Sequence, residues 1–125
     1  MKLLVFTSNA RRHRFVANIV SEVAGEALIV SEVPHPPKKS DAPVEPTIQE
    51  HFALRDQAEL DFFPKADSFR FNTLPVLKGE VNNPKTIAIV KKFKPDLVIV
   101  YGSSILKEPL LAAFPKNRAI NLHLG

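Results

Sequence analysis

The sequence predicts an α/β fold in which a mainly parallel sheet is doubly wound, with helices on both of its faces. Apolar runs of strand length alternate with segments of helical period, which is typical of βαβ units. The run from Leu97 to Tyr101 is apolar throughout, as expected of a strand that is buried on both faces. The length of 125 residues fits one small domain and leaves no room for two.

The first half predicts strand, loop, helix and strand in that order. Residues 2–6 form an apolar run, and a polar loop follows it from Thr7 to Asn9. Gly25 ends the next helix, and residues 27–33 form the second strand. The helix is indicated by three apolar residues at helical spacing, beside Val16 and Val20: Phe15, Ile19 and Val23.

Residues 34–47 predict a mobile surface loop, because prolines there prevent a helical or ladder hydrogen-bond pattern. A helix is expected from Thr47, with Thr47 as its N-cap and Glu50 as the capping-box partner, and it ends near Phe63 and Pro64. Within it, Arg55 and Glu59 are four residues apart and predict a surface ion pair.

The second half predicts three strands and two helices. The weakest strand, residues 73–77, contains a proline. A helix begins after Asn82 or Asn83, with Pro84 in its first turn, and ends at Lys94 and Pro95. The other elements are the central strand 97–101, a helix around residues 107–114 and a fifth strand at 118–122.

Composition excludes several classes of protein. There is no cysteine and no zinc-ligand spacing, so neither a disulfide framework nor a metal site is expected. No apolar run reaches the roughly 18 residues of a membrane span, and no secretory signal is present. The net charge of +4 comes from lysines of the second half without interleaved aromatic residues, so nucleic acid is not the expected partner. A reducing cytoplasm is the expected location.

Two polar residues of the fifth strand are the first candidate site. Side chains alternate along a strand, so Asn121 and His123 share a side, about 7 Å apart along the backbone. An amide and an imidazole there can donate hydrogen bonds to a carbonyl oxygen that gains negative charge, and histidine can move protons. Alternatively, both side chains close the strand by bonding loop backbone.

Two loops are expected at the same edge of the sheet, where ligands bind in open parallel sheets. Tyr101, Gly102, Ser103, Ser104, Ile105 and Leu106 follow the central strand and form either one wall of a flat slot or an ordinary turn with Ser103 or Ser104 as a helix N-cap. The other loop holds Ser8 or Asn9 as a helix cap, without a phosphate-binding motif. Arg11, Arg12, His13 and Arg14 crowd the positive end of the helix dipole, which indicates either an anionic ligand or solvated arginines.

The strand Lys94 to Tyr101 with its Gly102 to Leu106 loop, followed by Ile120-Asn121-Leu122-His123, resembles the folate-dependent formyltransferases. That family includes glycinamide ribonucleotide, methionyl-tRNA and sugar N-formyltransferases. The match is good over residues 94–125, consistent in element order over 1–33 and loose over 34–80. The resemblance implies a Rossmann-like sheet that transfers a formyl group from 10-formyltetrahydrofolate to the amine of a small acceptor.

The resemblance also implies residue roles. Asn121 and His123 correspond to the catalytic asparagine and histidine, and Tyr101 to Leu106 correspond to the pterin-binding segment. Ser8, Asn9, Arg11 and Arg12 lie where relatives hold the acceptor, although the glycine-rich form of that loop is missing. The alternatives are a formyltetrahydrofolate hydrolase and a non-catalytic fragment or binding module.

One departure from the family pattern concerns its third catalytic residue, an aspartate located beyond the N-x-H pair. Asp96 precedes the fourth strand and is expected at the opposite end of the sheet. We therefore expect residues 1–125 to be the amino-terminal part of a longer formyltransferase-like protein. As a whole product, the chain is expected to have weak or absent catalysis and to self-associate through the exposed edge of the fifth strand.

Overall fold

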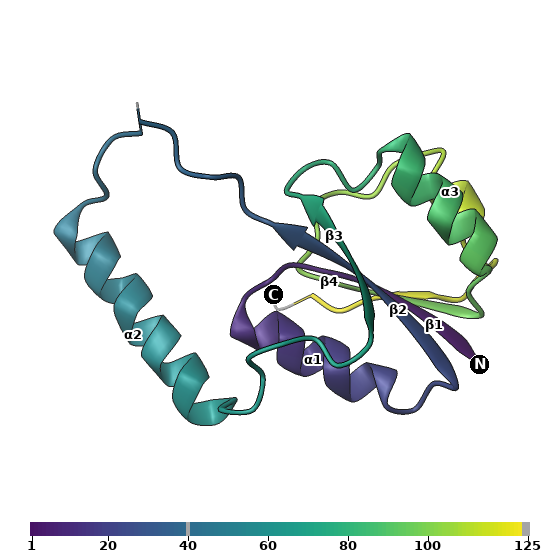
Figure 1. Cartoon of the computed structure of the whole chain (residues 1–125), viewed down its shortest axis with the longest axis horizontal. Coiled ribbons are helices and arrows are strands. Elements are labelled where there is room, and N and C mark those ends of the chain that lie inside the picture. Colours follow the sequence, from purple (N-terminus) through teal and green to yellow (C-terminus); the bar gives the residue numbers. More distant parts are fainter. Residues whose placement is uncertain (40, 124–125) are drawn as a thin grey trace.

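The computed structural model describes residues 1–39 and 41–123, which form one sheet of five parallel strands. The strand order is β3-β2-β1-β4-β5, so the order reverses between β1 and β4 (Figure 1). This topology confirms the doubly wound, Rossmann-like fold. The elements are β1 (Lys2–Thr7), α1 (Arg11–Ser21), β2 (Glu26–Val33), α2 (Pro46–Phe62), β3 (Asn72–Leu77), α3 (Pro84–Phe93), β4 (Leu97–Tyr101), the 3₁₀ helix η1 (Leu111–Ala113) and β5 (Ala119–Asn121).

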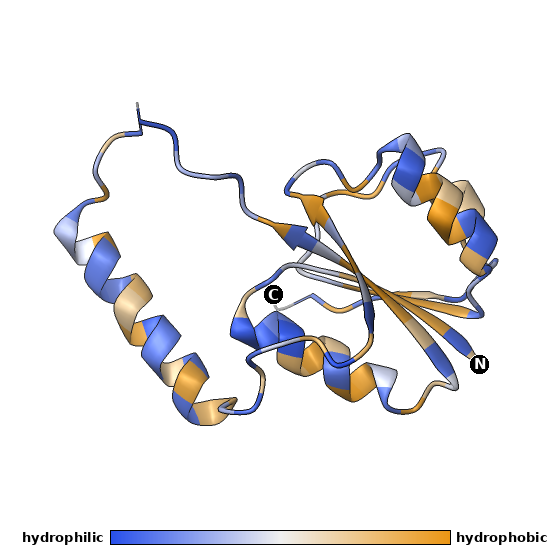
Figure 2. Ribbon diagram, in the orientation of Figure 1, coloured by the Kyte–Doolittle hydropathy of each residue, from blue (hydrophilic) through white to orange (hydrophobic). Residues whose placement is uncertain are grey.

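Two apolar layers cover the two faces of the sheet, because successive side chains of each strand point in opposite directions. In β1, Leu3 and Val5 pack with Ala17 of α1, whereas Leu4 and Phe6 belong to the layer under α3. Figure 2 shows that the central strands are the most hydrophobic part of the ribbon. Burying one such aliphatic side chain contributes about 1.5–3 kcal/mol, so the central strands hold the fold together.

The predicted start and end of α3 are confirmed. The Asn83 side chain accepts a hydrogen bond of 2.8 Å from the Thr86 amide, and Pro84 occupies the first turn, where it sacrifices no helical bond. Lys94 ends the helix in the left-handed conformation, with φ of 53°. The proline-containing strand is also confirmed as β3, and it lies at the edge of the sheet, where Pro75 is tolerated.

Three predicted helix boundaries are wrong. Helix α2 begins at Pro46 after Glu45, so Thr47 is not its N-cap. Helix α1 ends at Ser21, and Gly25 instead lies in the turn to β2, where its amide donates to the Met1 carbonyl. Residues 107–114 contain only the three-residue η1, Leu111–Ala113, in place of the predicted helix.

Helix α2 stands beside the sheet (Figure 1), and Glu59 is its one buried residue. The predicted pair of Arg55 with Glu59 is wrong: Arg55 pairs with Asp56, and Glu59 pairs with Arg12 of α1. The described part of the proline-rich segment, residues 34–39 and 41–45, contains neither helix nor strand.

Candidate functional site

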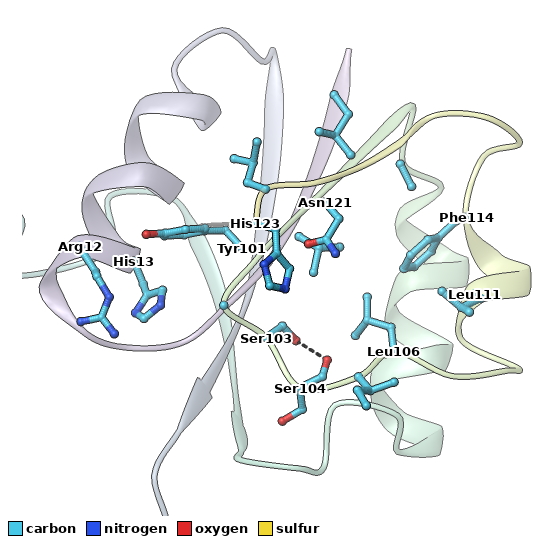
Figure 3. Close-up of a pocket in the computed structure, with 16 residues that line it drawn as sticks. Arg12, His13, Tyr101, Ser103, Ser104, Leu106, Leu111, Phe114, Asn121 and His123 are labelled. Atoms are coloured by element: carbon cyan, nitrogen blue, oxygen red, sulfur yellow. Dashed lines mark hydrogen bonds between the residues drawn. The ribbon is translucent and has the colours of Figure 1, made fainter. Parts of the chain in front are cut away.

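A pocket of about 620 Å³ lies where β1, β4 and β5 end, next to the point at which the strand order reverses (Figure 3). Ligands bind at this place in doubly wound sheets, and the volume is within the range of small-molecule sites. The lining residues come from the start of α1, from the segment after β4, from η1 and its flank, and from β5: Arg12, His13, Val100, Tyr101, Gly102, Ser103, Ser104, Ile105, Leu106, Leu111, Phe114, Ala119, Ile120, Asn121, Leu122 and His123.

Asn121 and His123 both line this pocket, and Figure 3 shows their side chains projecting into it together. The register explains the arrangement, because Asn121 pairs with Val100 and the Leu122 amide donates to the Val100 carbonyl at 2.8 Å. Both residues are exposed. Within residues 1–39 and 41–123, neither side chain hydrogen-bonds to loop backbone, so both are oriented toward the pocket and not used to close the strand.

The segment from Tyr101 to Leu106 forms another wall. Gly102 has φ of 70°, and a Cβ there would lie 2.4 Å from Nε2 of His13, so only glycine fits. Ile105 is 79% exposed and offers an apolar surface to the pocket. Because no helix follows directly after this segment, Ser103 and Ser104 are not helix N-caps, and that alternative is wrong.

Of the four residues predicted from the first loop, only Arg12 lines the pocket. The Ser8 hydroxyl donates to the Gly102 carbonyl and thereby supports the pocket wall. Asn9 accepts a 3.2 Å bond from Arg14, and α1 is capped by Ala10 without a side-chain bond, so neither Ser8 nor Asn9 caps the helix.

The arginines of this turn have partners inside the protein. Arg11 donates to the Phe63 and Pro64 carbonyls, at 3.2 Å each, and Arg12 pairs with Glu59. Burial opposes ionisation of Glu59, but the hydrogen bonds and charge of Arg12 outweigh it and hold the pKa of Glu59 below its usual value. These arginines therefore connect α1 to the end of α2, a role that the charge pattern alone does not reveal.

Sequence reasoning missed His13, which is 7% exposed and lines the pocket beneath Gly102. Its ring centroid lies 5.1 Å from that of Tyr101. Burial, followed by the charge of Arg12, lowers the pKa of His13 from 6.5 to about 4, so the imidazole is neutral at pH 7. Among the described residues, its Nδ1 atom has no hydrogen-bond partner.

The spacing of residues along α1 does indicate that His13 is on the buried face of the helix. The predicted apolar stripe of Phe15, Ile19 and Val23 is exposed, at 38%, 46% and 77%, and Val23 lies beyond the end of α1. The buried face instead runs through His13, Ala17 and Ser21, at the same spacing of four residues. Hydropathy does not reveal this face, because two of its three residues are polar. The arginines on either side of His13 also give the segment the composition of a solvent-exposed turn.

Asp96 lies outside this pocket. Its Oδ2 accepts a 2.7 Å hydrogen bond from the Lys2 amide at the amino end of the strands, as predicted. Among the described residues, no three histidine or carboxylate side chains are grouped to hold a metal ion, and no helix is long and apolar enough to cross a membrane.

Fold and site together define an α/β protein with a pocket at the carboxyl ends of a doubly wound parallel sheet. No protein-family model matches the chain, and no curated protein matches it.

Proposed function

We propose that the protein transfers a formyl group from 10-formyltetrahydrofolate to the amine of a small acceptor. The observation that carries this proposal is the meeting of an amide and an imidazole, from Asn121 and His123, with the Tyr101 to Leu106 segment around one pocket. This combination supplies polar groups for a reacting carbonyl beside an apolar surface for a flat heterocycle.

In the proposed reaction, the acceptor nitrogen attacks the formyl carbon and forms a new carbon–nitrogen bond. The carbonyl oxygen gains negative charge, which the Asn121 amide and the His123 imidazole stabilise by hydrogen bonds. The bond from the formyl carbon to folate N10 then breaks. The acceptor amine loses one proton, and N10 gains one, and an imidazole can carry that proton because its ring nitrogens both donate and accept.

The shape and lining of the pocket suit the donor. Apolar side chains form its walls on two sides, from Ile105 and Leu106 after β4 and from Phe114 after η1. A planar pteridine ring stacks well on such surfaces, and the backbone carbonyl of Ser103 can accept a hydrogen bond from its edge. Arg12 lines the same pocket and is the one residue of the predicted acceptor loop positioned to meet a second substrate.

The proposal includes partners and a location. Folate and a small amine are the proposed ligands, and a cysteine-free chain suits the reducing cytoplasm. In the described sheet, β5 is an edge strand, with Ile120 47% exposed, which supports self-association of two copies along this edge. Sedimentation at increasing concentration tests this: a constant monomer mass contradicts it.

We expect slow turnover by the wild type, because Asp96 lies at the other end of the sheet and no aspartate is among the described residues that line the pocket. The test of function compares that turnover with turnover by the variants His123→Ala and Asn121→Ala. Release of tetrahydrofolate is measured with 10-formyltetrahydrofolate and a set of small amines. Removing one group that stabilises an oxyanion typically costs about a hundredfold in turnover, and we expect at least that loss. His51→Ala, at an exposed position on α2, is the matched control and should leave turnover unchanged.

Three results would contradict the proposal. Unchanged turnover in His123→Ala removes the role of the imidazole. Release of formate without any amine identifies a hydrolase. Binding of tetrahydrofolate without turnover in the wild type identifies a non-catalytic binding module.

A further inference from the structure

A buried carboxylate supports the pocket wall from a strand that does not line the pocket. Glu32, the penultimate residue of β2, is 3% exposed. Its Oε2 accepts two hydrogen bonds from Ser104, at 3.1 Å from the amide and 2.8 Å from the hydroxyl. Ser104 lines the pocket, whereas Glu32 does not. The carboxylate therefore acts on a ligand only through the wall.

The hydrogen bonds of Glu32 offset only part of the free-energy cost of burying its carboxylate. Within the part of the chain that the structure describes, its Oε1 is buried without a hydrogen-bond partner, and no cation pairs with the carboxylate. Taking a carboxylate out of water costs several kcal/mol, and two hydrogen bonds from one serine offset only part of that cost. Replacing a buried charged group by an apolar side chain is often neutral or stabilising, so stability of the fold is not a sufficient reason for a glutamate at this position.

The wall itself has no regular secondary structure to hold it. After β4 ends at Tyr101, residues 103–106 form neither helix nor strand. Side chains from elsewhere hold the flanks, since Ser8 bonds the Gly102 carbonyl and Asn82 donates to the Ile105 carbonyl at 2.9 Å. Glu32 holds the point between them, at Ser104.

The bond to the Ser104 amide fixes the peptide between Ser103 and Ser104. That peptide determines which way its carbonyl, and the adjoining backbone groups, face at the pocket. A carboxylate that accepts from both the amide and the hydroxyl of one residue restricts its backbone and its side-chain rotamer at once. The ordering cost is then met before a ligand arrives, which increases affinity.

We propose that Glu32 is a positioning residue of this pocket: its buried carboxylate fixes Ser104, and with it the ligand-binding conformation of the Ser103 to Leu106 wall. The choice of tetrahydrofolate as the probe rests on the proposed function, but the effect on the wall does not. Replacing Glu32 by an apolar residue is therefore expected to weaken ligand binding without lowering the stability of the fold.

The experiment compares Glu32→Leu, Glu32→Gln and the control Glu26→Leu at the exposed start of the same strand. Three quantities are measured for each: the urea midpoint of unfolding, the hydrogen-exchange rate of the Ser104 amide and the Kd for tetrahydrofolate. For Glu32→Leu we expect an unchanged or higher midpoint, with exchange at least about tenfold faster and affinity about tenfold weaker. Glu32→Gln keeps an acceptor oxygen and should stay within about threefold of the wild type in both.

A purely structural role would lower the urea midpoint of Glu32→Leu in parallel with its affinity, or prevent that variant from folding, and either result overturns the proposal. Unchanged exchange at Ser104 overturns it as well. If the wild type fails to bind tetrahydrofolate, the proposed function fails, while the exchange rate of Ser104 still decides the role of Glu32.

Discussion

The two ends of the parallel sheet differ in how deeply their polar side chains are buried and in whether those side chains are fully hydrogen-bonded. At the amino end, Lys2 pairs with Glu26 at 3.3 Å and its amide bonds Asp96, and all these groups are at the surface. At the carboxyl end, His13 and Glu32 are buried, and each retains an atom without a hydrogen-bond partner among the described residues. Four buried side-chain groups have an atom without a partner among the described residues: His13 lines the pocket and Glu32 bonds its wall, whereas Ser21 and Thr86 do neither.

The largest expected effect on stability is that of substituting Gly102 by alanine, compared with the same substitution at Gly79. Both glycines have a positive φ. Gly102→Ala brings a Cβ to 2.4 Å from His13, whereas the same change at Gly79 meets nothing within 4 Å. A left-handed residue costs about 1–2 kcal/mol at either site, and overpacking adds about 1–3 kcal/mol at Gly102 alone. Urea unfolding should therefore show a clearly larger loss for Gly102→Ala. Equal losses would mean that His13 does not pack against the turn.

A smaller effect is expected from pH. The pKa of His13 is about 4 in the folded protein and 6.5 as its ordinary value, so between these values the unfolded chain binds more protons. The free energy of unfolding should therefore fall as pH decreases from about 6.5 to about 4, by at most about 3 kcal/mol. Above pH 6.5 this contribution is fully present.

Comparison with His13→Asn isolates that contribution, because Glu59, whose pKa is also lowered, loses stabilisation on acidification in both proteins. The difference between the wild type and His13→Asn should shrink as pH falls through the window from 6.5 to 4. Parallel stability curves across that window would show that His13 is not buried in its neutral form.

The sequence was sufficient for elements whose signals are local. Asn83 with Pro84 and Lys94 fixed both ends of α3, because caps and prolines act within one turn. The uninterrupted apolar run of β4 predicted a central strand, since a parallel strand buries both faces. The alternation of side chains also placed Asn121 and His123 on one side, where both line the pocket.

The burial and the partners of the residues that support the pocket wall could not be predicted from local sequence patterns. Glu32 at the end of an apolar strand looks like a residue that returns to solvent, and its partner Ser104 lies 72 positions away. The burial of His13 depends on the turn at Gly102, which comes from another strand. Likewise, Glu59 pairs with Arg12 in a different helix and not with its own helical neighbour Arg55. Tertiary contacts decide these positions, and no local periodicity encodes them.

The proposed folate site is tested most directly by titrating tetrahydrofolate into the protein while following the backbone amide resonances. We expect shifts at Gly102, Ser104, Asn121 and His123, and none at Lys2 or at the other residues of the amino end. A second hollow of about 380 Å³ between α1 and the end of α2, lined by Phe15 and Phe63, provides an internal comparison. Shifts confined to that hollow, or no shifts at all, would contradict the assignment of the folate site.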